Sequence, residues 1–202
     1  GSCGACAAGT GAPPMTVNIS GTNYNFYSSY FVMDITNPDS PKLLWSFNSS
    51  DLGLTTSVPA VVRVNPAADA KASNTNAKWY MVAGSGPTGY DASTAQGAKV
   101  FVIDLATGPG SSNTLVTSYS VGSWNSYMGD MTAFDRDLDY RHDVVYFGRV
   151  INDGTPPWRG KIYRLTMGAG GVTAKFGTVT SPTQWGIASG SARVPTEMLD
   201  TF

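Results

Sequence analysis

The sequence is poor in charged residues and in residues that favour helices. Only 13% of its 202 residues are Asp, Glu, Lys or Arg, against about 25% in an ordinary soluble domain. Glutamate occurs once, at Glu197, and lysine six times. The charged residues that best support helices are therefore nearly absent. The formal net charge of −1 argues against a nucleic-acid-binding protein, because such proteins need clustered Lys and Arg.

Long hydrophobic runs are also missing. The longest uncharged apolar runs cover five or six residues, whereas a membrane helix needs about 20. We therefore expect no membrane span. Hydrophobic residues still make up 42% of the chain, which is enough to build a core and argues against disorder.

Cysteine is scarce, since only Cys3 and Cys6 are present. A c-type haem site needs His after the second Cys, but Ala7 stands there. Structural zinc needs about four ligands, and His142 is the only histidine. The Gly-rich surroundings lack the βαβ context of a thioredoxin-like pair. We expect a local loop disulfide in an oxidising compartment, and leave open free thiols or pairing with a segment outside this chain.

Turn-forming residues are abundant, with 23 Gly and 12 Pro alongside many Ser, Thr and Asn. We expect residues 1–29, which carry the cysteine pair, to form a Gly/Ser/Thr-rich irregular segment (loop or irregular edge strand). Residues 30–202 predict an all-β domain, because short runs rich in Val, Ile and aromatic residues alternate with turn signals. The expected strands are 30–36, 42–47, 58–64, 78–83, 99–105, 115–121, 131–134, 144–148 and 161–166.

These predicted strands repeat along the chain. The runs YFVMDIT (30–36), KVFVIDL (99–105) and KIYRLT (161–166) look alike and start 62 to 69 residues apart. Four strands per repeated unit is the pattern of β-propeller blades. We predict a partial β-propeller with about half a blade, two full blades and the opening strand of another at 186–194. A solenoid or a sandwich is the alternative.

One loop concentrates the acidic residues. Asp135, Asp137, Asp139 and Asp143 fall on odd-numbered positions of a nine-residue stretch between two predicted strands. Such charges repel one another unless a cation neutralises them, and Ca²⁺ takes about six to eight oxygen ligands. The spacing matches a calcium loop in which these carboxylates occupy positions one, three, five and nine, and Arg141 donates its backbone carbonyl at position seven.

Two positions of this loop depart from an EF-hand. Tyr140 stands at position six, where glycine is expected, and Tyr146 stands where the bidentate glutamate should be. Without flanking helices, the pattern indicates a calcium loop within a β-hairpin, with waters completing the ligand shell. The alternative is a solvated acidic turn that Arg136 and Arg141 partly neutralise.

Patterns that would indicate an enzyme are weak. Residues 84–89 fit G-x-G-x-x-G, but Pro87 and the segment 90–97 leave no room for the helix that a dinucleotide site requires. We interpret these residues as a loop. A Ser-His-Asp triad would have to recruit His142 from inside the acidic loop, and no carboxylate pair stands out for glycoside hydrolysis. We expect no catalytic activity.

Three stretches in combination resemble one known family. Residues 30–47 read Y-x-x-x-D-I-T-x-P followed by LW-x-F, residues 52–61 read LGLT and then SVPAV, and residues 160–165 read G-K-I-Y-R-L. Together they resemble the PilY-type proteins, the tip-associated adhesins and biogenesis factors of bacterial type IV pili. The resemblance covers roughly residues 27–168. The acidic loop falls where that family carries its calcium site.

The resemblance implies a quinoprotein-like propeller whose calcium occupancy regulates pilus extension, retraction and surface attachment. It places the protein outside the cell or on its surface, at the pilus tip or outer membrane. The implied partners are pilins or the remaining segments of the same propeller, and a host or surface ligand. Because the chain starts at Gly1 and cannot close a ring, we expect a fragment, a processed product or one subunit of a split protein.

Two other functions stay open at this point. A quinone-cofactor dehydrogenase shares the fold, and Asp104-Leu-Ala-Thr107-Gly108 echoes its blade repeat. A structural component of another surface filament would differ only in its partner.

Overall fold

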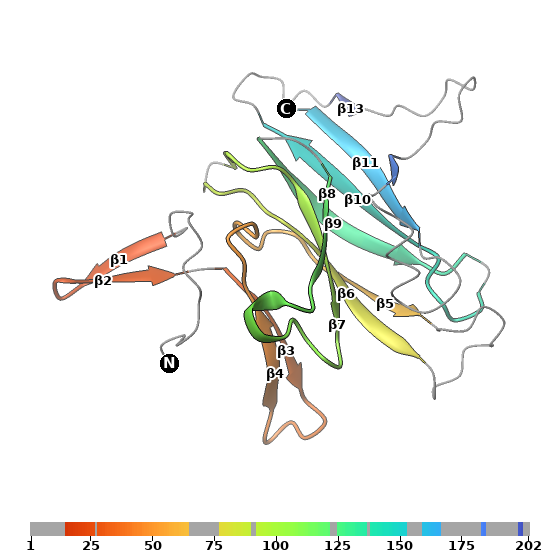
Figure 1. Cartoon of the computed structure of the whole chain (residues 1–202), viewed down its shortest axis with the longest axis horizontal. Helices are drawn as coiled ribbons and strands as arrows, with labels where there is room; N and C mark the ends of the chain where they lie inside the picture. Colours follow the sequence, from red (N-terminus) through yellow and green to blue (C-terminus); the bar gives the residue numbers. More distant parts are fainter. Residues whose placement is uncertain are drawn as a thin grey trace.

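The computed structural model describes residues 15–26, 28–64, 77–89, 92–121, 125–136, 138–152, 159–166, 183–184 and 198–199. In these ranges the regular structure is antiparallel β-sheet, apart from one short 3-10 turn, η1 (Ser111–Asn113) (Figure 1). The all-β prediction is therefore confirmed. Cys3, Cys6 and the run 186–194 lie outside the described residues, and the described strands do not make a closed ring.

The central sheet is a four-stranded meander in the order β5-β6-β7-β8. Its strands are β5 (Ala60–Val64), β6 (Lys78–Gly84), β7 (Lys99–Asp104) and β8 (Thr117–Ser120). Consecutive residues of β6 and β7 are buried, so both faces of the sheet are covered along most of these two strands. Consecutive apolar residues are typical of strands that are buried on both faces, and they predicted β6 and β7 from the sequence.

The second sheet repeats this order as β9-β10-β11-β12. Its strands are β9 (Ser126–Phe134), β10 (Val144–Ile151), β11 (Arg159–Thr166) and β12 (Thr183–Gln184), and β13 (Met198–Leu199) also pairs with β11. The predicted grouping of four strands per unit is confirmed for the central sheet. The second sheet has five strands, because β13 pairs with β11 as β12 does. Strand β9 begins five residues before the expected position 131, because the pairing with β10 continues past an irregularity between Phe147 and Arg149.

A two-stranded sheet covers the other side of the central sheet. It pairs β3 (Tyr30–Asp34) with β4 (Lys42–Phe47), as expected for half a unit. Two apolar clusters hold the three layers together. One joins the central sheet to the β9–β12 sheet and includes Val62, Val82, Val100, Met128, Met131, Phe147 and Tyr163. The other joins the central sheet to β3–β4 and includes Phe47, Leu52, Met81, Phe101 and Ile103.

The N-terminal region departs from the expectation of an irregular segment. A hairpin forms there from β1 (Met15–Ile19) and β2 (Thr22–Phe26). Ser20 and Gly21 connect the strands, and both have positive φ, of 50° and 84°. Two-residue hairpin turns favour this geometry because it matches the twist of the strands. The Ser-Gly pair between two alternating segments was the sequence signal, and the high polar content of the region obscured it.

No helix among the described residues is long and apolar enough to cross a membrane.

Candidate metal-binding loop

The acidic loop connects the first two strands of the second sheet, as predicted. It starts where Phe134 pairs with Val144 across β9 and β10. The backbone N–H of Asp143 donates to the carbonyl of Phe134 at 2.8 Å and closes the base of the loop. Asp137 lies outside the described residues, so the structure gives no position for this predicted ligand.

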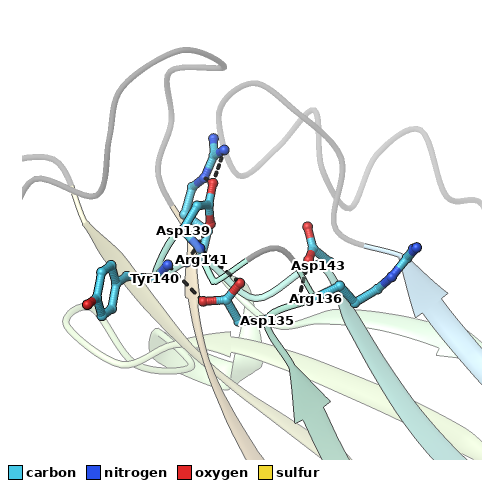
Figure 2. A network of polar contacts seen from close by, with 6 residues as sticks. All are labelled: Asp135, Arg136, Asp139, Tyr140, Arg141 and Asp143. Carbon is cyan, nitrogen blue, oxygen red and sulfur yellow. Dashed lines mark hydrogen bonds and ion pairs between the residues drawn. The ribbon is translucent and has the colours of Figure 1, made fainter.

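Asp135 organises the turn. One oxygen of its carboxylate accepts the backbone N–H of Asp139 at 3.2 Å, and the other accepts that of Tyr140 at 2.7 Å (Figure 2). These bonds fold the middle of the loop back over its first residue. Tyr140 has φ 66°, which is the left-handed conformation that glycine adopts most easily. The backbone at position six therefore has the geometry of a glycine, although tyrosine occupies it at a cost of about 1–2 kcal/mol.

Two further carboxylates are held by neighbouring donors. Asp139 forms an ion pair with the guanidinium of Arg141 and also accepts the Arg141 backbone N–H at 2.9 Å. Asp143 accepts the backbone N–H of Arg136 at 2.7 Å. Arg141 therefore neutralises a loop carboxylate with its guanidinium, as the predicted alternative requires, whereas the bond from Arg136 to Asp143 comes from an uncharged backbone amide.

The described carboxylates point in different directions (Figure 2). Within the part of the chain that the structure describes, no three carboxylate, imidazole or thiol groups converge on one point. The donor chemistry nevertheless fits a hard cation, since Asp135, Asp139, Asp143 and the Arg141 carbonyl offer only oxygen ligands. Each carboxylate oxygen has two lone pairs, so accepting one backbone N–H leaves capacity for a metal.

His142 anchors the loop to the central sheet. Its backbone N–H donates to the carbonyl of Arg63 at 3.0 Å, and its Nδ1 accepts the Arg63 N–H at 2.9 Å. Arg63 lies on β5, and its guanidinium stands 5.8 Å from the centre of the Trp79 ring on β6. The sequence offered no sign of this role, because the two partners are 79 positions apart.

The glycine-rich segment 84–89 forms a loop, as interpreted. Gly84 ends β6, and Gly86 donates its N–H to the carbonyl of Leu52 at 2.8 Å. In the described residues between Gly84 and Lys99 no helix begins. This segment therefore lacks the helix N-terminus that binds a dinucleotide pyrophosphate.

Comparisons with known proteins find few similar ones. No family model matches the chain, and no curated protein does. Among solved structures, the crystal structure of the Pseudomonas aeruginosa PilY1 C-terminal domain is similar over 68% of this chain, with 22% sequence identity and a TM-score of 0.47. The chain spans 24% of the length of that protein.

Proposed function

We propose that this chain is part of an extracellular β-propeller that binds calcium through the loop 135–143 and acts in a type IV pilus tip adhesin or biogenesis factor. Calcium binding is supported by the way in which the loop folds around Asp135. Both oxygens of this carboxylate accept backbone N–H groups from positions five and six. The turn is thus closed in the way that a short cation-binding loop requires, with position six in the left-handed conformation.

In this proposal Asp135, Asp137, Asp139 and Asp143 supply carboxylates and Arg141 supplies its backbone carbonyl. Asp139 is paired with the Arg141 guanidinium, so its carboxylate would have to give up that ion pair in order to hold calcium. Exchanging an ion pair for a dication costs affinity. We therefore expect weaker binding than that of loops built as cytosolic buffers, whose dissociation constants are about 10⁻⁹–10⁻⁸ M.

Support for a propeller comes from the four-stranded meander β5–β8, from the meander β9–β12 that follows it, and from the two-stranded half unit before them. Propellers are built from such sheets arranged around an axis. The pilus part is supported by the sequence resemblance of residues 30–47, 52–61 and 160–165 to PilY-type proteins. Recovery of pilins with the calcium-loaded chain, and their loss on chelation, is the corresponding experiment.

Thermal unfolding with and without calcium tests the cation site. At calcium about 100-fold above the dissociation constant, binding adds about 2.7 kcal/mol of stability. For a chain of this size we expect the melting temperature to rise by about 5–10 °C relative to the chelated protein. Asp139→Ala should abolish this rise. Asp39→Asn, which changes an exposed aspartate in the β3–β4 connection, is the matched control and should keep it.

We propose a binding module and not a dehydrogenase. An absorption spectrum of the purified protein separates the two, because a bound quinone absorbs at wavelengths longer than those at which the Trp and Tyr side chains of an empty propeller absorb.

A further inference from the structure

Strand β3 has a neighbour on only one edge. Among the described strands it pairs with β4 alone. The corresponding third strands of the two complete sheets, β7 and β11, are paired on both edges, with β6 and β10 on the side where β3 has none. An unpaired strand edge presents a row of free N–H and C=O groups that can bind another strand.

The correspondence between β3 and β7 extends to how each strand ends. Asp34 is the last residue of β3, and its Oδ1 accepts the N–H of Thr36 at 2.9 Å. Asp104 is the last residue of β7, and its Oδ1 accepts the N–H of Ala106 at 2.8 Å. The same Asx turn therefore closes both strands. Strand β3 thus corresponds to the third strand of a four-stranded sheet whose first and second strands are not in place.

The central sheet is uncovered where those two strands would lie. On its β3–β4 side, Met81 and Phe101 are buried. Val61 on β5 pairs with Met81, and Trp79 on β6 shares the face of Met81, yet their side chains are 47% and 46% exposed. On the opposite face, Val62 of β5 is fully buried under the β9–β12 sheet. Val61 and Trp79 therefore lie on the face that β3–β4 partly buries, but they remain exposed themselves.

The hairpin β1–β2 has the matching apolar face. Val17, Ile19 and Tyr24 share one side of it, because Val17 pairs with Tyr24 and strand residues alternate. Ile19 and Tyr24 are 51% and 48% exposed, and the hairpin pairs with no other described strand (Figure 1). Only residues 27–29 separate β2 from β3, which is the length of a common three-residue hairpin connection.

We propose that the β1–β2 hairpin closes onto the free edge of β3, so that β1-β2-β3-β4 becomes a third four-stranded sheet over Val61 and Trp79. With three connecting residues, Phe26 lies opposite Tyr30 and Tyr24 opposite Val32. Tyr24 then joins the half-buried face of β3 that already carries Tyr30 and Val32. The N-terminal half unit is in this way completed by the chain's own hairpin, with no need of a partner strand. This inference depends on strand order and burial, and not on calcium.

Disulfide trapping tests the closed arrangement. In a Cys3→Ser, Cys6→Ser background, Asn25→Cys with Phe31→Cys places two cysteines opposite each other on the outer face, where Cα atoms of paired strands lie about 4.5–5.5 Å apart. Asn18→Cys with Phe31→Cys is the control, because β1 would lie two strands from β3, about 9.5 Å away and beyond the disulfide limit. We expect the intramolecular disulfide to form at least about tenfold faster in the Asn25→Cys, Phe31→Cys pair than in the control pair.

Equal rates for the two pairs would overturn the proposal, and so would links formed only between molecules, which would identify a second copy as the occupant. Hydrogen exchange on the unmodified chain gives a check that no substitution can disturb. Closure protects every amide of β3, whereas an open edge leaves alternate amides exchanging at loop rates. Full protection of β3 without the Asn25–Phe31 link would show that something other than this hairpin covers the edge, and would also contradict the proposal.

Discussion

Single residues determine how closely the sheets of this protein approach each other. Gly84 ends β6 under the second sheet, and a Cβ atom placed on it would lie 2.3 Å from Cβ of Met128. Met128 is fully buried, and its N–H donates to the carbonyl of Ser85 at 2.7 Å. Because Met128 is buried and its backbone is bonded to Ser85, it has little room to move away. The contact between the sheets therefore depends on the absence of a side chain at position 84.

Gly84→Ala is therefore expected to destabilise the fold by about 1–3 kcal/mol through overpacking. Urea unfolding followed by circular dichroism measures the change. Gly148→Ala on β10 is the matched control, since a Cβ there has nothing within 4 Å. The control should be neutral or stabilising by up to about 1 kcal/mol, because alanine restricts the unfolded chain. Equal losses in both variants would contradict the close approach.

His142 should stabilise the fold by anchoring the acidic loop to β5. His142→Ala removes the Nδ1 acceptor of the Arg63 N–H, which is partly buried. We expect a loss of about 1–2 kcal/mol in the free energy of unfolding, because the amide is left without its partner. His142→Asn is the control, since its side-chain oxygen can accept the same N–H and should retain part of the stability. An alanine variant as stable as the original chain would show that the anchor has no energetic role.

At the scale of elements, hydrophobic pattern was sufficient to predict most of the structure. The strands β3 to β11 fall where apolar runs lie between turn signals, and β4 has the predicted bounds 42–47. The four-strand units were visible because similar third strands recur along the chain. The hairpin β1–β2 was missed because half of its residues are polar and it has no predicted neighbour to cover its apolar face.

The candidate site could be predicted less completely. Acidic spacing identified the loop and its place between β9 and β10. It did not show that Asp139 faces the Arg141 guanidinium, or that His142 binds the edge of β5. Both depend on backbone conformation and on tertiary packing, which a one-dimensional pattern does not contain. Tyr140 is a related case, because a tyrosine at this position argued against the left-handed backbone conformation that the residue adopts.

The central sheet also predicts an alkaline limit to stability. Burial raises the pKa of Tyr119 on β8 from 10.0 to about 12. The pKa of Tyr80 on β6 is raised as well, first by burial and then by the Asp104 carboxylate that it faces. A folded-state pKa above the unfolded value favours the neutral phenol in the folded chain. The stabilisation from Tyr119 is therefore complete below pH 10 and is lost as the pH rises towards 12.

Tyrosinate absorbance should show the phenols of Tyr119 and Tyr80 ionising late, together with unfolding. Asp104→Asn keeps an oxygen for the Asx turn and removes the charge beside Tyr80. It should lower the pKa of Tyr80 without affecting Tyr119. Ionisation of Tyr119 and Tyr80 near pH 10 while the chain stays folded would be inconsistent with the packing described.

At the scale of the whole molecule, three layers share the central sheet. The β9–β12 sheet covers most of one face, while β3–β4 covers part of the other. The acidic loop extends from the second sheet and binds back to β5 of the central one through His142. A cation in this loop would therefore stabilise a junction between two sheets as well as the loop itself.

Isothermal titration of chelator-treated protein with calcium determines whether the loop 135–143 binds this cation. We predict one binding event per chain, absent from Asp135→Asn, because that substitution removes the carboxylate around which the loop folds. Asp39→Asn should bind as the unaltered chain does. No heat of binding in the unaltered chain, or binding that survives unchanged in Asp135→Asn, would contradict a calcium site at residues 135–143.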